Sequence, residues 1–207
     1  MFCRGAVPPV VGIAREGQRD SEKIMDYSGR VLDYLSGEAS IKSVILAAQW
    51  SLYTKGWNEN PEEGLPGFAG HPFATLQAME DYYRDQIRFT VKRLLDAGKQ
   101  VAIVYPVLEV GFDIPDYLSK RSAAGLPMPS AVPCPDFKER QAAVIAALDS
   151  IGDHPNLSRV RPHDRLMDKD DVKILLGREP LYFDDDHLST PGAFYLKALF
   201  EPVFPKL

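Results

Sequence analysis

Hydrophobic residues follow two alternating patterns along the first half of the chain. Residues 20–36 and 75–97 carry apolar side chains at the spacing of one helix face, and each stretch ends just before a glycine. Each is followed by a continuous apolar run, residues 43–50 and residues 100–105. An apolar run without alternation is typical of a parallel strand that is buried on both faces. This order of a helix followed by a strand occurs twice, and it predicts an α/β fold with a mainly parallel sheet and helices on its faces.

The remaining elements are shorter and more polar. We expect a helix over residues 136–151, a short strand over residues 157–161 and a polar connection over residues 162–177. Three segments rich in Pro, Gly or polar residues are predicted to be irregular: 1–16, 54–73 and 126–135. The second of these is too long for a mere connector, so it is a candidate wall over a site. Nothing in the pattern repeats, and one domain over residues 1–207 is the expected organisation.

Candidate chemistry gathers near the C-terminus. An apolar run, Leu181 to Phe183, ends in three carboxylates and a histidine, Asp184 to His187. A carboxylate three residues before an imidazole can fold back to accept its Nδ1 proton, which leaves Nε2 free to act as a base. Asp184 and His187 have that spacing. Two other interpretations remain open: an acidic loop with a solvated histidine, and a hard metal ion bound by the acidic run.

Two further residues follow the predicted strands. Trp50 ends the first apolar run, where its ring is a candidate stacking platform for a sugar; a buried structural role is the alternative. Glu109 follows the second run and is a candidate contact for substrate hydroxyls, or a loop carboxylate bonded to backbone. The carboxyl ends of parallel strands are where open α/β folds bind ligands.

Several of these stretches resemble one known family. The block Leu181-Tyr182-Phe183-Asp184-Asp185-Asp186-His187-Leu188-Ser189, continued by Gly192-Ala193, looks like the last motif of the SGNH (GDSL-type) hydrolases. It is most similar to the SGNH domain fused to the membrane domain of acyltransferase family 3 proteins, which O-acylate cell-surface glycans. Residues 44–53 resemble that family's "VILAARW..Y" strand, and residues 104–111 its "PVPEVG" segment.

The resemblance implies a fold and a mechanism. The fold would be a three-layer α/β/α sandwich of the flavodoxin-like SGNH type. In the family, serine attacks an acyl ester, and the histidine and aspartate complete a triad, so Asp184 would orient the ring of His187 as the base. The substrate would be a carbohydrate or acyl ester, the partner a membrane acyltransferase domain, and the location periplasmic or otherwise extracytoplasmic. No cofactor and no metal are implied.

Two departures from the family pattern bear on this interpretation. The family carries a cysteine pair in an "LCD...C" pattern, where this chain has Leu166-Met167-Asp168 and Val172. The family also begins with a strand that ends in Gly-Asp-Ser-His and provides the nucleophile, and Gly-Asp-Ser occurs nowhere in this sequence. We therefore expect an N-terminally incomplete domain that lacks the first strand. Three serines are candidates to replace this nucleophile, and Ser51, which follows a predicted strand, is preferred: Ser21, Ser51 and Ser189.

Composition narrows the remaining classes of function. The 207 residues are 45% hydrophobic and 26% charged, with a net charge of −5 and no basic block, which argues against a nucleic-acid surface. No run approaches the roughly 18 apolar residues of a membrane span. No secretory signal is recognisable near Met1, so the chain expressed as written would be cytoplasmic. Cys3 and Cys134 match no metal spacing and are expected to be free thiols.

Two hypotheses of different class remain. In the first, the chain is an acyltransferase or esterase domain that acts on O-acetyl or other O-acyl esters of glycans, with its nucleophile unassigned. In the second, it is a non-catalytic remnant that binds glycan or packs against a partner. A missing strand would expose backbone donors and acceptors on its neighbour, so dimerisation or poor solubility is expected in both cases.

Overall fold

The computed structural model describes residues 10–14, 20–53, 68, 70, 71 and 73–203. The chain divides into two compact units, each of which is described by itself. The first comprises residues 1–105 and 140–159, and the second comprises residues 106–139 and 160–207. The predicted irregular segment 1–16, the predicted wall 54–73 and Cys3 fall wholly or largely outside the described residues.

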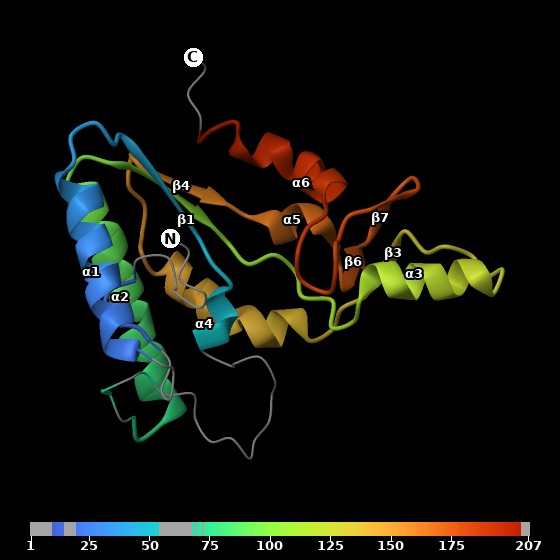
Figure 1. Cartoon of the computed structure of the whole chain (residues 1–207), viewed down its shortest axis with the longest axis horizontal. Helices are drawn as coiled ribbons and strands as arrows, with labels where there is room; N and C mark the ends of the chain where they lie inside the picture. Colours follow the sequence, from blue (N-terminus) through green and yellow to red (C-terminus); the bar gives the residue numbers. More distant parts are fainter. Residues whose placement is uncertain (1–9, 15–19, 54–67, 69, 72, 204–207) are drawn as a thin grey trace. The chain divides into compact units, whose positions relative to one another are not determined.

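A parallel sheet organises the first unit. Its strands are β1 (Ser43–Ala47), β2 (Gln100–Val104) and β4 (Leu157–Val160), in the order β1-β2-β4. β1 and β2 run parallel, in register from Ser43 opposite Gln100 to Ala47 opposite Val104 (Figure 1). β1 and β2 are the strands that the two apolar runs predicted, and β4 is the predicted short strand, so the predicted α/β fold class is confirmed.

Three helices accompany this sheet. They are α1 (Ser21–Gly37), α2 (Leu76–Asp96) and α4 (Phe137–Asp149), the last of which begins in the second unit. α2 begins at Thr75, whose side chain accepts a hydrogen bond from the backbone N–H of Ala78 at 3.2 Å. α1 and α2 pack side by side. All three helices lie within one to two residues of their predicted bounds, because their apolar faces are long and regular.

The apolar side chains of this unit form one core. Its fully buried members come from α2, β1, β2 and α4 and include the following residues: Tyr83, Ile87, Val91, Leu94, Leu46, Val101, Ile103, Val144 and Leu148. Lys99 is also buried, and its ammonium group donates to the carbonyl oxygens of Glu38 and Ile41 at 2.7 and 2.8 Å. A buried charge thus satisfies backbone acceptors beyond the end of α1.

The prediction that β1 is buried on both faces was wrong. Val44 and Leu46 are buried, whereas Ser43, Ile45 and Ala47 on the opposite face are exposed. Among the strands that the structure describes, β1 is one edge of its sheet and pairs only with β2. An edge strand packs fewer neighbours, and β2, which lies in the centre, has the continuous burial that was expected of both.

The second unit is built from shorter elements. Its helices are α3 (Ile114–Ala123), α5 (Pro162–Leu166) and α6 (Thr190–Leu196), which continues into the 3-10 turn η3 (Lys197–Phe200). β3 (Ala131–Pro133), β6 (Asp171–Lys173) and β5 (Met167–Asp168) form a small antiparallel sheet in that order. β7 (Leu175–Leu176) and β8 (Glu179–Pro180) form a two-stranded hairpin.

The sequence patterns did not predict most of these short elements. The segments 126–135 and 162–177 were predicted to be irregular or a polar connection, and they contain β3, α5 and β5 to β7. Those predictions were wrong because a strand of two or three residues is too short to show a period of two. Its partner comes from a distant stretch: Val132 lies opposite Val172.

This unit has an apolar cluster of its own. It joins the short elements through side chains that are almost fully buried: Leu108, Ile114, Val132, Cys134, Phe137, Leu166, Val172, Ile174, Leu181, Tyr182 and Leu196. Cys134 is a free thiol, as predicted. In the part of the chain that the structure describes, no helix has the length and apolar character needed to cross a membrane.

Candidate active site

The acidic loop begins and ends in buried backbone pairing. Leu181 and Tyr182 are 0% and 1% exposed, and Tyr182 forms an antiparallel bridge with Leu188. The N–H of Phe183 donates to the carbonyl of His187 at 2.7 Å. The chain therefore reverses direction over residues 184–186, and the apolar run holds the two ends of the reversal together.

Ser189 and Gly192 connect this loop to α6. The Ser189 hydroxyl donates to the carbonyl of Pro180 at 2.5 Å and accepts from the N–H of Gly192 at 3.1 Å, so it caps the helix. A Cβ atom on Gly192 would lie 2.0 Å from the carbonyl oxygen of Leu181. Only glycine allows this close approach of α6 to the backbone at Leu181. These contacts give a structural reason for the Ser-x-x-Gly spacing after the histidine.

A second segment braces the loop from outside. The N–H of Val110 donates to the carbonyl of Asp185 at 2.8 Å, and that of Ile114 to the carbonyl of Asp184 at 3.3 Å. The thiol of Cys134 in turn donates to the carbonyl of Glu109 at 3.3 Å. These backbone contacts hold the loop in addition to the hydrogen bonds that its acidic side chains make.

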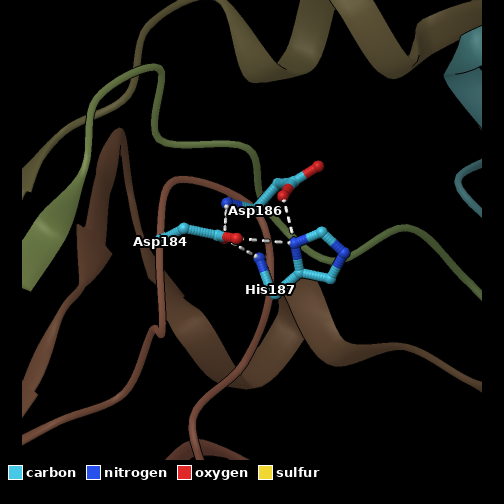
Figure 2. A group of neighbouring side chains, drawn as sticks. All are labelled: Asp184, Asp186 and His187. Atoms are coloured by element: carbon cyan, nitrogen blue, oxygen red, sulfur yellow. Dashed lines mark hydrogen bonds and ion pairs between the residues drawn. The ribbon is translucent and has the colours of Figure 1, made fainter.

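Asp184 and His187 make the contact that their spacing predicted (Figure 2). One carboxylate oxygen of Asp184, Oδ1, accepts from the backbone N–H groups of Asp186 and His187 at 3.0 and 2.7 Å. The other, Oδ2, lies 2.9 Å from Nδ1 of His187. The backbone N–H groups hold the Asp184 carboxylate in place, and this carboxylate in turn orients the His187 ring. The predicted contact between Asp184 and His187 is confirmed.

Asp186 also reaches the imidazole, which the sequence reasoning missed. Its Oδ1 lies 2.7 Å from the same Nδ1 atom, and its side chain is only 13% exposed. In Figure 2 the two carboxylates approach Nδ1 from different directions, while Nε2 points away from both. The position of Asp186, directly before His187, could have indicated this contact. The sequence interpretation assigned the acidic run as a whole only to possible metal binding.

The pKa values of the three groups reflect this arrangement. Burial acts to raise the pKa of Asp184, but hydrogen bonds from the backbone of His187 and Asp186 and from the imidazole lower it overall. Partial burial acts to lower the pKa of His187, but the charge of Asp186 and the hydrogen bond of Asp184 raise it overall. The pKa of Asp186 is raised, first by burial and then by the neighbouring carboxylates, against the opposing charge of His187.

The geometry leaves one ring nitrogen available. The His187 side chain is 70% exposed. When the proton of the neutral ring is on Nδ1, in the hydrogen bond to Asp184, the ring presents an unprotonated Nε2 that can accept a proton from a hydroxyl group.

Comparison with known proteins identifies the family of this chain. The family model described as "SGNH domain (fused to AT3 domains)" matches residues 1–202. The chain belongs to this family. The resemblance drawn from the sequence motifs is therefore confirmed. No curated protein matches the chain.

A solved structure agrees on the fold of this SGNH domain. It is the periplasmic domain of a lipopolysaccharide acetyltransferase from Salmonella ser. Paratyphi A, with a TM-score of 0.62 and 14% sequence identity. The match covers 95% of this chain and 68% of that one. At this level of identity the likeness supports the fold alone.

The two predicted substrate contacts of the SGNH domain have different surroundings. Trp50 is 1% exposed, and its indole N–H donates to the carbonyl of Val104 at 2.8 Å. This burial favours the structural role that the sequence left as the alternative to sugar stacking. Glu109 is half-buried, one residue before the Val110 N–H that braces the acidic loop. Its role as a substrate contact stays a prediction.

The structure weakens two of the candidate nucleophiles. Ser189 is engaged by Pro180 and Gly192 as the cap of α6. Ser51, the preferred candidate, is 1% exposed and lies in the 3-10 turn η1 (Trp50–Tyr53) of the first unit. Ser21 is the first residue of α1. The nucleophile of this SGNH domain is therefore left to experiment.

The acidic loop has the donor atoms for a metal ion. One ligand atom each from Asp184, Asp186 and His187 lie within 4.8 Å of one another. Exposed acidic groups often gather in this way without a metal, and here Nδ1 and the carboxylates already satisfy one another. We assign the arrangement to positioning of the ring and keep the prediction that no metal is needed.

Proposed function

We propose that this chain is an SGNH acyltransferase or esterase domain that acts on O-acyl esters, in particular O-acetyl esters, of cell-surface glycans. The observation that carries the proposal is the 2.9 Å contact from Asp184 Oδ2 to His187 Nδ1, made by a carboxylate that two backbone N–H groups hold in place. Membership of the SGNH family supports the class of reaction.

His187 is the general base of the proposed reaction, and Asp184 orients it. Nε2 takes the proton of an attacking hydroxyl, whose oxygen forms a bond to the acyl carbon. As the ester breaks, the imidazolium returns the proton to the leaving oxygen. A sugar hydroxyl or water then resolves the acyl-enzyme by the same exchange in reverse. The carboxylates at Nδ1 stabilise the positive charge that the ring carries between these steps.

The setting of the reaction follows from the family. We propose that the two units form one domain that works beside a membrane AT3 domain, outside the cytoplasm, with Glu109 near the substrate. The family's domains are described as fused to AT3 domains, and the structural neighbour is described as periplasmic. Pairing of two copies through the edge of β1 that no other described strand covers is part of this proposal.

A non-catalytic role in binding glycan or a partner is the second candidate function. It is favoured by the absence of Gly-Asp-Ser from the 207 residues and by the burial of Ser51. A base without a hydroxyl to activate would leave only binding, since triad members act as a unit.

Ester hydrolysis distinguishes the two functions. The chain is assayed on p-nitrophenyl acetate beside His187→Ala, with His154→Ala as the matched control, because His154 is also exposed. Loss of a general base lowers the rate by roughly 10²- to 10⁴-fold. We expect that loss only for His187→Ala, and we expect the wild-type rate to rise with pH through the raised pKa of His187. Equal rates in all three proteins would favour the non-catalytic role.

Covalent labelling then finds the hydroxyl. A fluorophosphonate reacts with an activated serine, and peptide mass spectrometry identifies the labelled residue. The mechanism predicts labelling that disappears in His187→Ala. A chain that neither hydrolyses the ester nor takes the label supports the binding role.

A further inference from the structure

Two carboxylates lie close to one nitrogen of the imidazole. Nδ1 of His187 is hydrogen-bonded to Asp184 Oδ2 at 2.9 Å and forms an ion pair with Asp186 Oδ1 at 2.7 Å (Figure 2). A triad of the usual kind needs only one carboxylate at this nitrogen. The second carboxylate therefore has a role that the triad does not explain.

The two carboxylates differ in what holds them. Asp184 is anchored by two backbone N–H groups, which fix its orientation and share its negative charge. Asp186 is the more buried of the two: its side chain is 13% exposed, against 31% for Asp184. Charges in a less solvated position interact more strongly because water screens them less. Geometry thus suits Asp184 for orienting the ring and Asp186 for stabilising its charge.

We propose that Asp186 is a second positioning residue for His187: it forms an ion pair with Nδ1 beside the hydrogen bond of Asp184 and supplies the larger part of the negative charge that stabilises the imidazolium. The proposal deepens the proposed function and rests on it for its catalytic meaning. The contact itself exists whether or not the chain turns over an ester.

Other charged groups near the ring define the controls. Asp185 belongs to the same run but is exposed, and it acts on His187 less than Asp186 does. The bracing segment brings Glu109 and Asp113, and Asp113 Oδ1 is engaged by the N–H of Asp116 at 2.7 Å, as the cap of α3. Asp185→Asn therefore removes the same charge from the same loop without touching the ring.

The experiment is an NMR titration of His187, one of only four histidines in the chain. Ring ¹⁵N and ¹³C shifts are followed against pH in the wild type, Asp184→Asn, Asp185→Asn, Asp186→Asn and Asp186→Glu. We expect Asp186→Asn to lower the pKa of His187 at least as far as Asp184→Asn and further than Asp185→Asn. Asp186→Glu should restore most of the wild-type value. The Nδ1–H tautomer should remain dominant in Asp186→Asn and weaken in Asp184→Asn.

The outcomes separate this proposal from the proposed function. If Asp186→Asn shifts the titration no more than Asp185→Asn, the charge-stabilising role of Asp186 is wrong. If Asp186→Asn also disturbs the signals of His71, His154 and His163, the variant has changed more than the site, and Asp186→Glu is compared with Asp185→Asn instead. A His187 pKa that is lower in Asp186→Glu than in Asp185→Asn would show that the proposed role of Asp186 is wrong. A chain without esterase activity that still shows the expected order keeps the Asp186 contact and loses the catalytic proposal.

Discussion

The two units of this chain are stabilised in different ways. The first rests on long elements whose apolar side chains meet in one core, with Leu94 and Ile103 among its fully buried members. In the second, the acidic loop is held by individual backbone contacts: the cap at Ser189, the close approach at Gly192 and the brace from Val110. Removing carbon atoms from its core should therefore damage the first unit, whereas adding a single carbon at Gly192 should damage the acidic loop of the second unit.

The largest effect is expected in the first unit. Leu94→Ala removes a fully buried side chain from α2, which should lower the free energy of unfolding by about 4 kcal/mol. Leu94→Met keeps the volume and should lower it by less than about 1.5 kcal/mol. Urea denaturation of the three proteins checks the difference. Similar stability for both variants would mean that this core is not close-packed.

The second unit should respond to an added methyl group. Gly192→Ala places a Cβ atom 2.0 Å from the Leu181 carbonyl oxygen, so α6 must move away from the backbone at Leu181. We expect a loss of about 3 kcal/mol in the free energy of unfolding, together with shifted ring signals of His187. The matched control is Gly29→Ala in α1, where a Cβ meets nothing within 4 Å and stability should rise by about 0.5 to 1 kcal/mol. Equal stability of the two variants would contradict the contrast between the units.

The cysteine pair of the family can be restored as a further test of the second unit. Met167 and Val172, at the places of that pair, lie directly opposite each other in the β5–β6 ladder. The double variant Met167→Cys, Val172→Cys should form a disulfide on oxidation. Closing so short a loop should stabilise the oxidised form over the reduced one by about 2 kcal/mol. Thiol titration measures whether the disulfide forms, and melting with and without reductant measures the gain in stability. Free thiols after oxidation would contradict the register of β5 and β6.

The smallest effect is a pH dependence of stability. The pKa of His187 is raised in the folded chain, so its contribution is fully present below the unfolded value of about 6.5 and is lost as pH rises through the folded value. The pKa of Asp184 is lowered, so its contribution is present above about 3.9 and is lost as pH falls through the folded value. The melting temperature of the wild type minus that of His187→Ala should therefore decrease as pH rises past about 6.5. A difference that grows with pH would contradict the assigned contacts.

Predictability from sequence also differs between the units. The bounds of α1, α2, α4 and the three parallel strands were predicted to within three residues, and β1 differs most, since it ends at Ala47. Long amphipathic helices and continuous apolar runs show in the sequence which residues will be buried. Only the exposed face of β1 was missed, since the residues of a strand do not reveal whether a neighbour covers them.

In the second unit, α3 and the short antiparallel strands were missed. α3 starts at Ile114 with a proline in its first turn, and β3 pairs with β6, roughly 40 residues away. Strands of this kind depend on distant partners more than on local preference.

The candidate site was predictable in part. The spacing of Asp184 and His187 gave their contact, since a reversal over three residues brings the side chains together whatever surrounds them. The sequence also determined the α/β fold class and the family. Only the tertiary structure decided that Asp186 turns toward the same nitrogen, that Trp50 and Ser51 are buried, and that Gly192 lies against Leu181. These outcomes depend on which groups packing shields from water, and packing joins residues that the sequence keeps far apart.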